Sequence, residues 1–130
     1  MISPLSDTNP LLTIVTVFDV GQQGNSPSGR FLFLLNQEVM HVTDRNSVLE
    51  YRLSDDSFAR GIRFTGYFAT DSHNQLTLAE PFTDISIKLR HANDSEALLI
   101  KVSLQVIDIA NPTVRGALDP QITNVPSPHV

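Results

Sequence analysis

Four histidines are the side chains of this sequence best suited to hold a metal ion or to carry a proton near neutral pH. They are His41, His73, His91 and His129. None lies in an H-x-H or H-E-x-x-H pattern, which would place two ligands on one face of an element. His41 and His91 are expected at or near strand ends, where their rings could converge. Because a metal site needs three or more converging ligands, we predict unpaired histidines, no metal site and no cofactor.

The aspartates gather in segments that are expected to be turns. None of these segments has the D-x-D-x-D-G spacing that wraps a chain around a calcium ion. Aspartate is frequent in turns because its carboxylate accepts hydrogen bonds from nearby backbone amides. We therefore interpret these residues as turn formers: Asp55, Asp56, Asp71, Asp84 and Asp94.

A catalytic triad can be assembled on paper from Ser54 or Ser57 with His73 and Asp71. No G-x-S-x-G turn presents either serine as a nucleophile. The chain has no cysteine, which excludes thiol nucleophiles, thiolate zinc sites and disulfides. The sequence therefore predicts a protein that is not an enzyme, with a metal-dependent enzyme built on His and Asp residues as the alternative.

Length and charge narrow the class of protein further. The 130 residues carry a formal net charge of −5, and the nine basic residues are scattered, so we expect no nucleic-acid partner. The length predicts one domain, residues 1–130, with a polar lead-in arm at 1–10 and a proline-rich C-terminal segment at 111–130. The apolar run Leu11–Val20 is short and typical of a strand, so we expect no membrane partner and a cytoplasmic location.

The elements that must position these residues are strands. Apolar and polar residues alternate over Ala97–Ile109, which predicts a long strand with one face in a core and one face in water. Shorter runs of the same kind recur along the chain, and no segment predicts a long helix. We expect an all-β fold, an antiparallel β-sandwich of immunoglobulin-like or jelly-roll type with about seven to nine strands. The expected strands cover residues 11–19, 30–36, 38–42, 48–53, 61–70, 75–80, 84–91, 97–109 and 121–125.

Connections between these strands carry their own signals. The polar segment Ala92–Glu96 predicts a β-hairpin that joins Asp84–His91 to Ala97–Ile109. The segment Ser54–Arg60 is expected to be a loop or one helical turn capped by its first residue. The glycine-rich segment Gly21–Gly29 is the clearest loop of the chain.

The run Gly61–Thr70 predicts a strand whose outward row is Arg63, Thr65 and Tyr67. This row is the candidate ligand-binding surface, because tyrosine offers a flat ring with a polar tip for sugars or peptides. An ordinary exposed sheet face has the same composition. Gly66 takes an inward position, which marks a bulge or a close backbone approach. The inward row expected from the alternation is Ile62, Phe64 and Phe68.

Two dipeptides carry a resemblance to a known family. The chain contains Glu80-Pro81 and, near its end, Asp119-Pro120 followed by Gln121-Ile122-Thr123-Asn124. Together they resemble the DP-EP family of small bacterial proteins, and the second piece is similar to the tail of bacterial inclusion-body proteins. The resemblance implies a bacterial β-sandwich and supplies no activity.

The same dipeptides have a structural interpretation that needs no family. Pro120 fixes its own φ and favours an extended Asp119. The Asp119 carboxylate would then bond the backbone amides that follow it, in an Asx-type turn that aims Ile122 at the core. We therefore predict structural roles for Asp119 and Pro120, and likewise for Glu80 and Pro81, where Pro81 ends a strand.

The function we predict is a non-enzymatic binding or assembly module that self-associates as a homodimer through its edge strands. Edge strands must be covered, charged or paired with another chain, and several strands here carry few charges. The alternative is a carbohydrate- or peptide-binding domain that uses the face near Tyr67 or the loop Gly21–Gly29.

Overall fold

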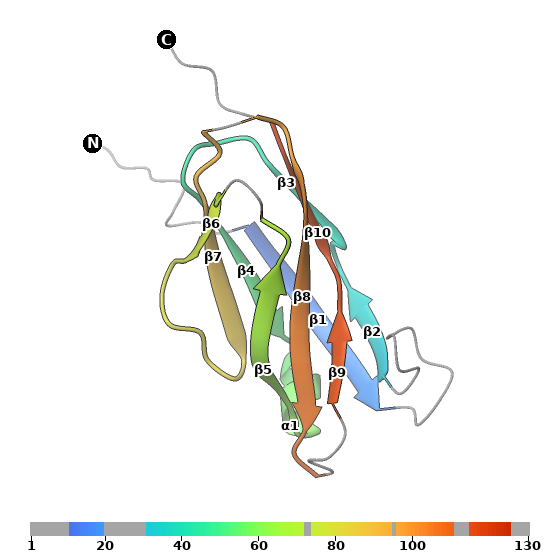
Figure 1. Cartoon of the computed structure of the whole chain (residues 1–130). Helices are drawn as coiled ribbons and strands as arrows, with labels where there is room; N and C mark the ends of the chain where they lie inside the picture. The colour runs from blue at the N-terminus through green and yellow to red at the C-terminus, as the bar shows by residue number, and fades with distance from the viewer. Residues whose placement is uncertain (1–10, 20–30, 72–73, 95, 111–114, 126–130) are drawn as a thin grey trace, which may run out of the picture.

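The computed structural model describes residues 11–19, 31–71, 74–94, 96–110 and 115–125, and this part of the chain is almost entirely strands (Figure 1). Nine of the ten strands lie in the expected segments, which confirms the all-β prediction, whereas Arg115–Leu118 forms a further strand that was not expected and brings the number above the predicted seven to nine. In chain order the strands and one short helix are β1 (Leu11–Asp19), β2 (Phe31–Leu35), β3 (Val39–Val42), β4 (Ser47–Leu53), α1 (Asp55–Ala59), β5 (Ile62–Ala69), β6 (Leu76–Leu78), β7 (Ser86–His91), β8 (Leu99–Asp108), β9 (Arg115–Leu118) and β10 (Gln121–Asn124). The expected loop at Gly21–Gly29 lies outside the described residues.

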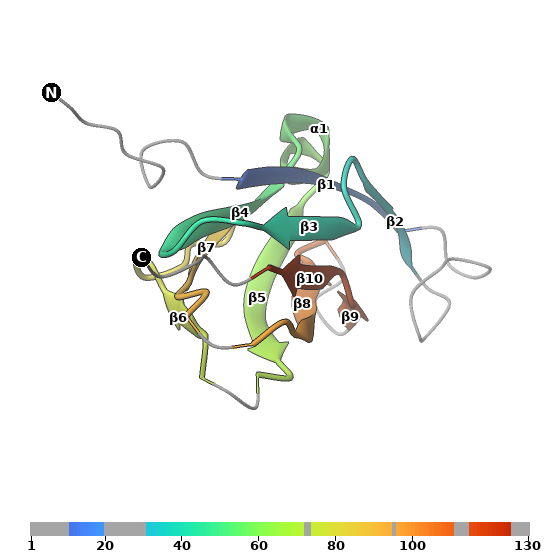
Figure 2. The ribbon, with the colours of Figure 1, turned by 90° about the horizontal axis from the view of Figure 1, so that it is seen from above.

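The strands form two sheets, which lie on opposite sides of a shared core (Figure 2). The first sheet has the order β2-β1-β4-β7-β6, and the second has the order β3-β10-β8-β5, with β9 also paired to β8. This confirms a β-sandwich. Most pairs are antiparallel as expected, but β1 runs parallel to β4 and β3 runs parallel to β10. Alternation reports which face of a strand is buried and carries no information on the direction of its neighbour.

Strand β8 is the centre of the second sheet. Ile100, Val102, Leu104 and Val106 are buried, whereas Lys101 on the opposite face is exposed, as the alternation predicts. On one side β8 pairs with β5 from Val102 to Asp108. On the other side it pairs first with β10 and then with β9. Its apolar face therefore lies at the middle of the core.

The hairpin predicted between β7 and β8 is wrong. Strand β7 pairs with β4 and β6 in the first sheet, so the connection carries the chain across to the second sheet. Asn93 turns the chain there with φ of 53°, and its Nδ2 donates to the Val125 carbonyl at 2.9 Å. Asn124 Nδ2 in turn donates to Asn93 Oδ1 at 2.8 Å. These buried amides tie the crossing to the end of β10, a long-range partner that a local turn pattern does not reveal.

The bulge predicted in β5 is present, and it reverses the facing of the residues beyond it. Phe64 is opposite Val106, and the pairing shifts before Gly66, so Thr65 is the extra residue. Beyond the bulge Tyr67 packs against the core, and Phe68 points outward with 64% of its surface exposed. The predicted inward Phe68 and outward Tyr67 are therefore wrong, because one inserted residue changes the phase of a period-two pattern.

Helix α1 begins with the predicted serine cap. Ser54 Oγ accepts a hydrogen bond from the Ser57 N–H at 3.2 Å, and two aspartates follow in the first turn, where the helix dipole favours negative charge. Ser57 is buried, and its Oγ accepts from the Val17 N–H at 2.8 Å. Ser57 thus fixes the helix against β1.

The Asp119-Pro120 pair separates β9 from β10, and its backbone holds the tail in place. The Val102 N–H donates to the Pro120 carbonyl at 2.9 Å, and Ile122 is fully buried, as expected. The predicted Asx turn is not found, because Asp119 is exposed and its carboxylate bonds none of the described backbone amides that follow it. Proline geometry and backbone pairing therefore do the work that we predicted for the Asp119 side chain.

Candidate functional site

The histidines that the structure describes do not meet. His41 is exposed on β3, where its Nδ1 lies 2.7 Å from Thr123 Oγ1, whereas His91 is buried at the end of β7 in the other sheet. Within the described ranges, no three His, Cys, Asp or Glu side chains gather into a group that could hold a metal ion. His73 and His129 lie outside those ranges.

His91 has a structural environment. The Asn93 N–H donates to its Nδ1 at 2.9 Å, so the ring proton resides on Nε2. Burial lowers the pKa of His91 below its usual value, although the charges of Asp71 and Asp94 act in the opposite direction. Among the described side chains, His91 Nε2 and the Tyr51 hydroxyl are buried polar groups without a hydrogen-bond partner. Burial also raises the pKa of Tyr51 well above that of a free phenol.

The described residues of the hypothetical catalytic triad form structural hydrogen bonds instead. Ser57 is buried between α1 and β1, and Ser54 caps the helix. The two carboxylate oxygens of Asp71 accept hydrogen bonds from the Gln75 and Leu76 amides at 2.9 and 2.7 Å, which close the turn before β6. These side chains therefore build turns and caps.

A buried carboxylate lies on the outer face of the first sheet, at a position where the alternation of β4 predicts a side chain exposed to water. Glu50 is only 2% exposed and accepts hydrogen bonds from Arg52, at 2.8 and 3.0 Å, and from Ser86 Oγ, at 2.8 Å. Burial on its own would raise the pKa of Glu50, but the bonds from Arg52 and Ser86 and the charges of Arg52 and Lys88 outweigh it and lower the pKa. Arg52 and Ser86 satisfy the hydrogen-bonding capacity of the Glu50 carboxylate, so Glu50 and Arg52 form a structural ion pair.

The predicted surface row Arg63, Thr65 and Tyr67 does not form one surface. The Arg63 guanidinium lies 3.5 Å from the centre of the Phe58 ring and donates to the carbonyls of Phe58 and Ile62, each at 2.8 Å. It therefore holds α1 against β5. Thr65 is exposed at the bulge, and Tyr67 faces the core side of the sheet. Of the three residues, Tyr67 alone reaches the hollow described next.

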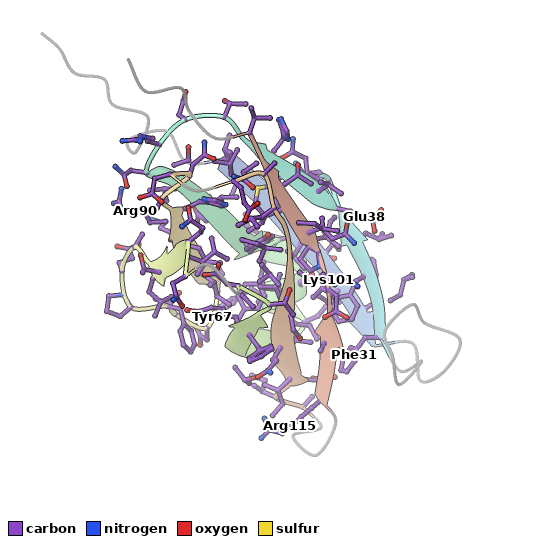
Figure 3. The ribbon with its side chains drawn as sticks, turned by 45° about the horizontal axis from the view of Figure 1, so that its top comes forward. Phe31, Glu38, Tyr67, Arg90, Lys101 and Arg115 are labelled. Atoms are coloured by element: carbon purple, nitrogen blue, oxygen red, sulfur yellow. The ribbon has the colours of Figure 1, made fainter. Side chains whose placement is uncertain are left out.

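An open groove of ≈ 410 Å³ lies between β5 and β6, which are the last strands of their sheets on the same side of the sandwich. The Tyr67 ring meets the Phe82 ring edge to face, with centres 6.5 Å apart. Figure 3 shows Tyr67 on the β6 side of the molecule, away from Phe31 and Glu38. The groove is lined by Tyr67, Phe68, Ala69, Asp71, Asn74 and Leu76.

Beside this groove, no described strand pairs with the edge of β5 that faces away from β8. The Thr70 N–H donates to the Lys101 carbonyl at 2.9 Å, so alternate residues before it, Phe68 and Gly66, also face β8. The N–H and C=O groups of Tyr67 and Ala69 consequently point away from β8. Nearer the start of the strand the edge is covered, because the Phe64 N–H donates to the Asp84 carbonyl at 2.7 Å. The open edge is therefore the part of β5 beyond the bulge.

The open edge lacks the usual protection of an edge strand. Residues 64–70 contain neither a charged residue nor a proline. Natural edge strands are commonly blunted by charges, prolines or covering loops, since unpaired backbone groups recruit other strands. The exposed Phe68 adds an apolar side chain at the same place. Alternation alone does not reveal this edge, although Gly66 carries a signal for it, since the bulge there reverses the facing of Tyr67 and Phe68.

Comparisons with protein families and curated proteins assign no function to this site. The sequence matches no protein-family model, and no curated protein is similar to it at a significant level. The resemblance to the DP-EP family stays a prediction. In the structure Glu80 pairs with Lys88 at 2.9 Å, and Pro81 is exposed. No helix in the described part of the chain is both long and apolar enough to span a bilayer.

Proposed function

We propose that this protein is a non-enzymatic assembly module that self-associates through the open edge of β5. One observation carries the proposal: the outward N–H and C=O groups of Tyr67 and Ala69 lie on an uncharged strand edge beside an open groove. Backbone groups of this kind bind another extended strand with main-chain hydrogen bonds. The partner is a second copy of this chain, which makes the protein a homodimer.

The other edges support this choice. Strand β6 has three residues and offers few backbone groups. On the far side of the sandwich, residues 36–38 lead directly from β2 into β3 in the other sheet, so the chain itself joins the two edges at the end of β2. Backbone bonds fasten this corner at both ends, from Asn36 N–H to the Ile14 carbonyl and from Gln121 N–H to the Glu38 carbonyl. We favour the edge of β5 because it is longer than that of β6 and, unlike the edges of β2 and β3, is not joined to the other sheet by a short connection.

Light scattering tests the proposal. The parent protein should have the mass of a dimer at micromolar concentration and dissociate on dilution. Phe68→Lys should give a monomer, because the two lysines would face each other across the interface. Leu99→Lys is the matched control: Leu99 is 54% exposed on the same sheet, in β8 rather than on the edge, so that variant should stay dimeric. A parent mass that is monomeric at every concentration contradicts the proposal.

A second candidate function is a carbohydrate- or peptide-binding domain that uses the same groove. The edge-to-face pair of Tyr67 and Phe82 favours it, since aromatic rings stack on sugars and on extended peptides. The Asp71 carboxylate is already engaged in its own turn, which leaves Asn74 and the Tyr67 hydroxyl as the available polar groups of the groove. A monomeric parent that binds glycans on an array, with binding lost in Tyr67→Ala, would establish this function instead.

A further inference from the structure

We infer that two copies of this chain pair antiparallel about a two-fold axis at Phe68, with Tyr67 of one copy opposite Ala69 of the other. The inference rests on the proposed self-association and adds its register. It also predicts that the second sheets of the two copies join into one continuous sheet across the interface.

The spacing of the outward backbone groups selects this register. Tyr67 and Ala69 are two residues apart, and both direct their N–H and C=O groups away from β8. In an antiparallel pair, two residues that face each other in this way exchange two hydrogen bonds. An axis at Phe68 places Tyr67 opposite Ala69 twice, once on each side, and therefore forms four backbone bonds.

Registers shifted by one residue in either direction would pair residues outside the regular part of β5. An axis at Tyr67 would set Ala69 against Thr65, the extra residue of the bulge, where the ladder is interrupted. An axis at Ala69 would set Tyr67 against Asp71, which lies beyond the end of β5 in a turn closed by its own carboxylate. The register centred on Phe68 stays within the regular part of the strand.

The side chains of the open edge fit the same register. The two Phe68 rings would face each other as a non-hydrogen-bonded pair on the outer surface, where the Cα atoms of such pairs lie about 4.5 Å apart. This contact would cover a side chain that is 64% exposed in the single chain. On the inner surface the large Tyr67 would lie opposite the small Ala69 in both halves. The groove beside Tyr67, Phe68 and Ala69 leaves space for the second strand.

Charge is compatible with a two-fold axis at this point. Such an axis places each residue near it close to its own copy, so a charged residue would meet an identical charge. Residues 64–70 are all uncharged. The charged residues that flank this segment are Arg63 and Asp71, and the Asp71 carboxylate is bonded within its own turn. Lys101 lies on β8 opposite Thr70, one strand away from the edge.

A single cysteine at the axis tests the register, because the natural chain has none. Cα atoms about 4.5–5.5 Å apart are within the range of a disulfide, so Phe68→Cys should form an intermolecular disulfide under mild oxidation. The chosen readout is the dimer band on a non-reducing gel, with the fraction linked followed over time. Leu99→Cys is the control, with a similarly exposed side chain on β8 that lies far from the axis in this register.

The outcomes separate the register from the self-association. Rapid linkage of Phe68→Cys with slow linkage of Leu99→Cys supports the inference. Equal linkage of the two variants overturns it, because random collision would explain both. A parent that is dimeric by light scattering while Phe68→Cys keeps a free thiol overturns the register and leaves the self-association standing. A monomeric parent overturns both.

Discussion

The ring of Phe31 in β2 lies directly over Gly116 in β9, and this contact joins the two sheets on the side of the molecule away from the open edge of β5. A Cβ added to Gly116 would lie 2.4 Å from Phe31 Cδ2. Phe31 is fully buried, so its ring has little freedom to move.

Gly116→Ala should therefore destabilise the protein by about 1–3 kcal/mol, the usual cost of forcing an extra methyl group into a packed core. Gly66→Ala is the control, because the added Cβ would approach only the flexible Gln105 Oε1, at 3.2 Å. Thermal unfolding of both variants checks the prediction. Equal melting temperatures for the two variants would contradict it.

Protonation of His91 should destabilise the fold in mildly acidic solution. Burial lowers its pKa in the folded state, so the unfolded chain, with a pKa near 6.5, binds the proton more readily. The free energy of unfolding should consequently fall as the pH drops below about 6.5, and level off below the lowered pKa of the folded state. Protonated Nδ1 would also lose the ability to accept from the Asn93 N–H.

Urea unfolding at pH 7 and pH 5 measures this effect. His91→Asn keeps an acceptor near the Asn93 amide, and it should be less stable at both pH values but lack this part of the pH dependence. A parent whose stability is the same at the two pH values would refute the role of His91.

The tail should depend on buried apolar contacts rather than on the Asp119 carboxylate. Ile122→Ala removes a fully buried side chain from the core and should cost about 2–5 kcal/mol. Asp119→Ala changes an exposed side chain and should stay within about 0.5 kcal/mol of the parent. Denaturant unfolding of the two variants decides the matter, and a loss for Asp119→Ala as large as that for Ile122→Ala would restore the Asx turn.

Local pattern predicted much of the fold. Alternation in β8 identified Ile100, Val102 and Leu104 as core residues, because successive side chains of a strand point to opposite faces whatever the strand pairs with. The serine cap of α1 was likewise visible, since a cap bonds an amide three residues away. These features depend on neighbours in the chain, and the sequence contains them directly.

The candidate site depended on strand pairing between distant residues, which a local sequence pattern does not contain. Gly66 predicted a bulge, but only the pairing with β8 showed that the bulge turns Tyr67 toward the core and Phe68 toward solvent. The same holds for the crossing at Asn93, whose side chain bonds Val125, a residue far along the chain.

By itself, then, the sequence determined that this chain is a β-sandwich and which face of most strands is buried. Only the tertiary structure decided which strands are neighbours, which pairs run parallel and which edge is left open. The physical reason is that the side-chain alternation of a strand is local. Strand order is instead set by backbone hydrogen bonds and contacts between residues distant in sequence, and every backbone offers the same donors and acceptors.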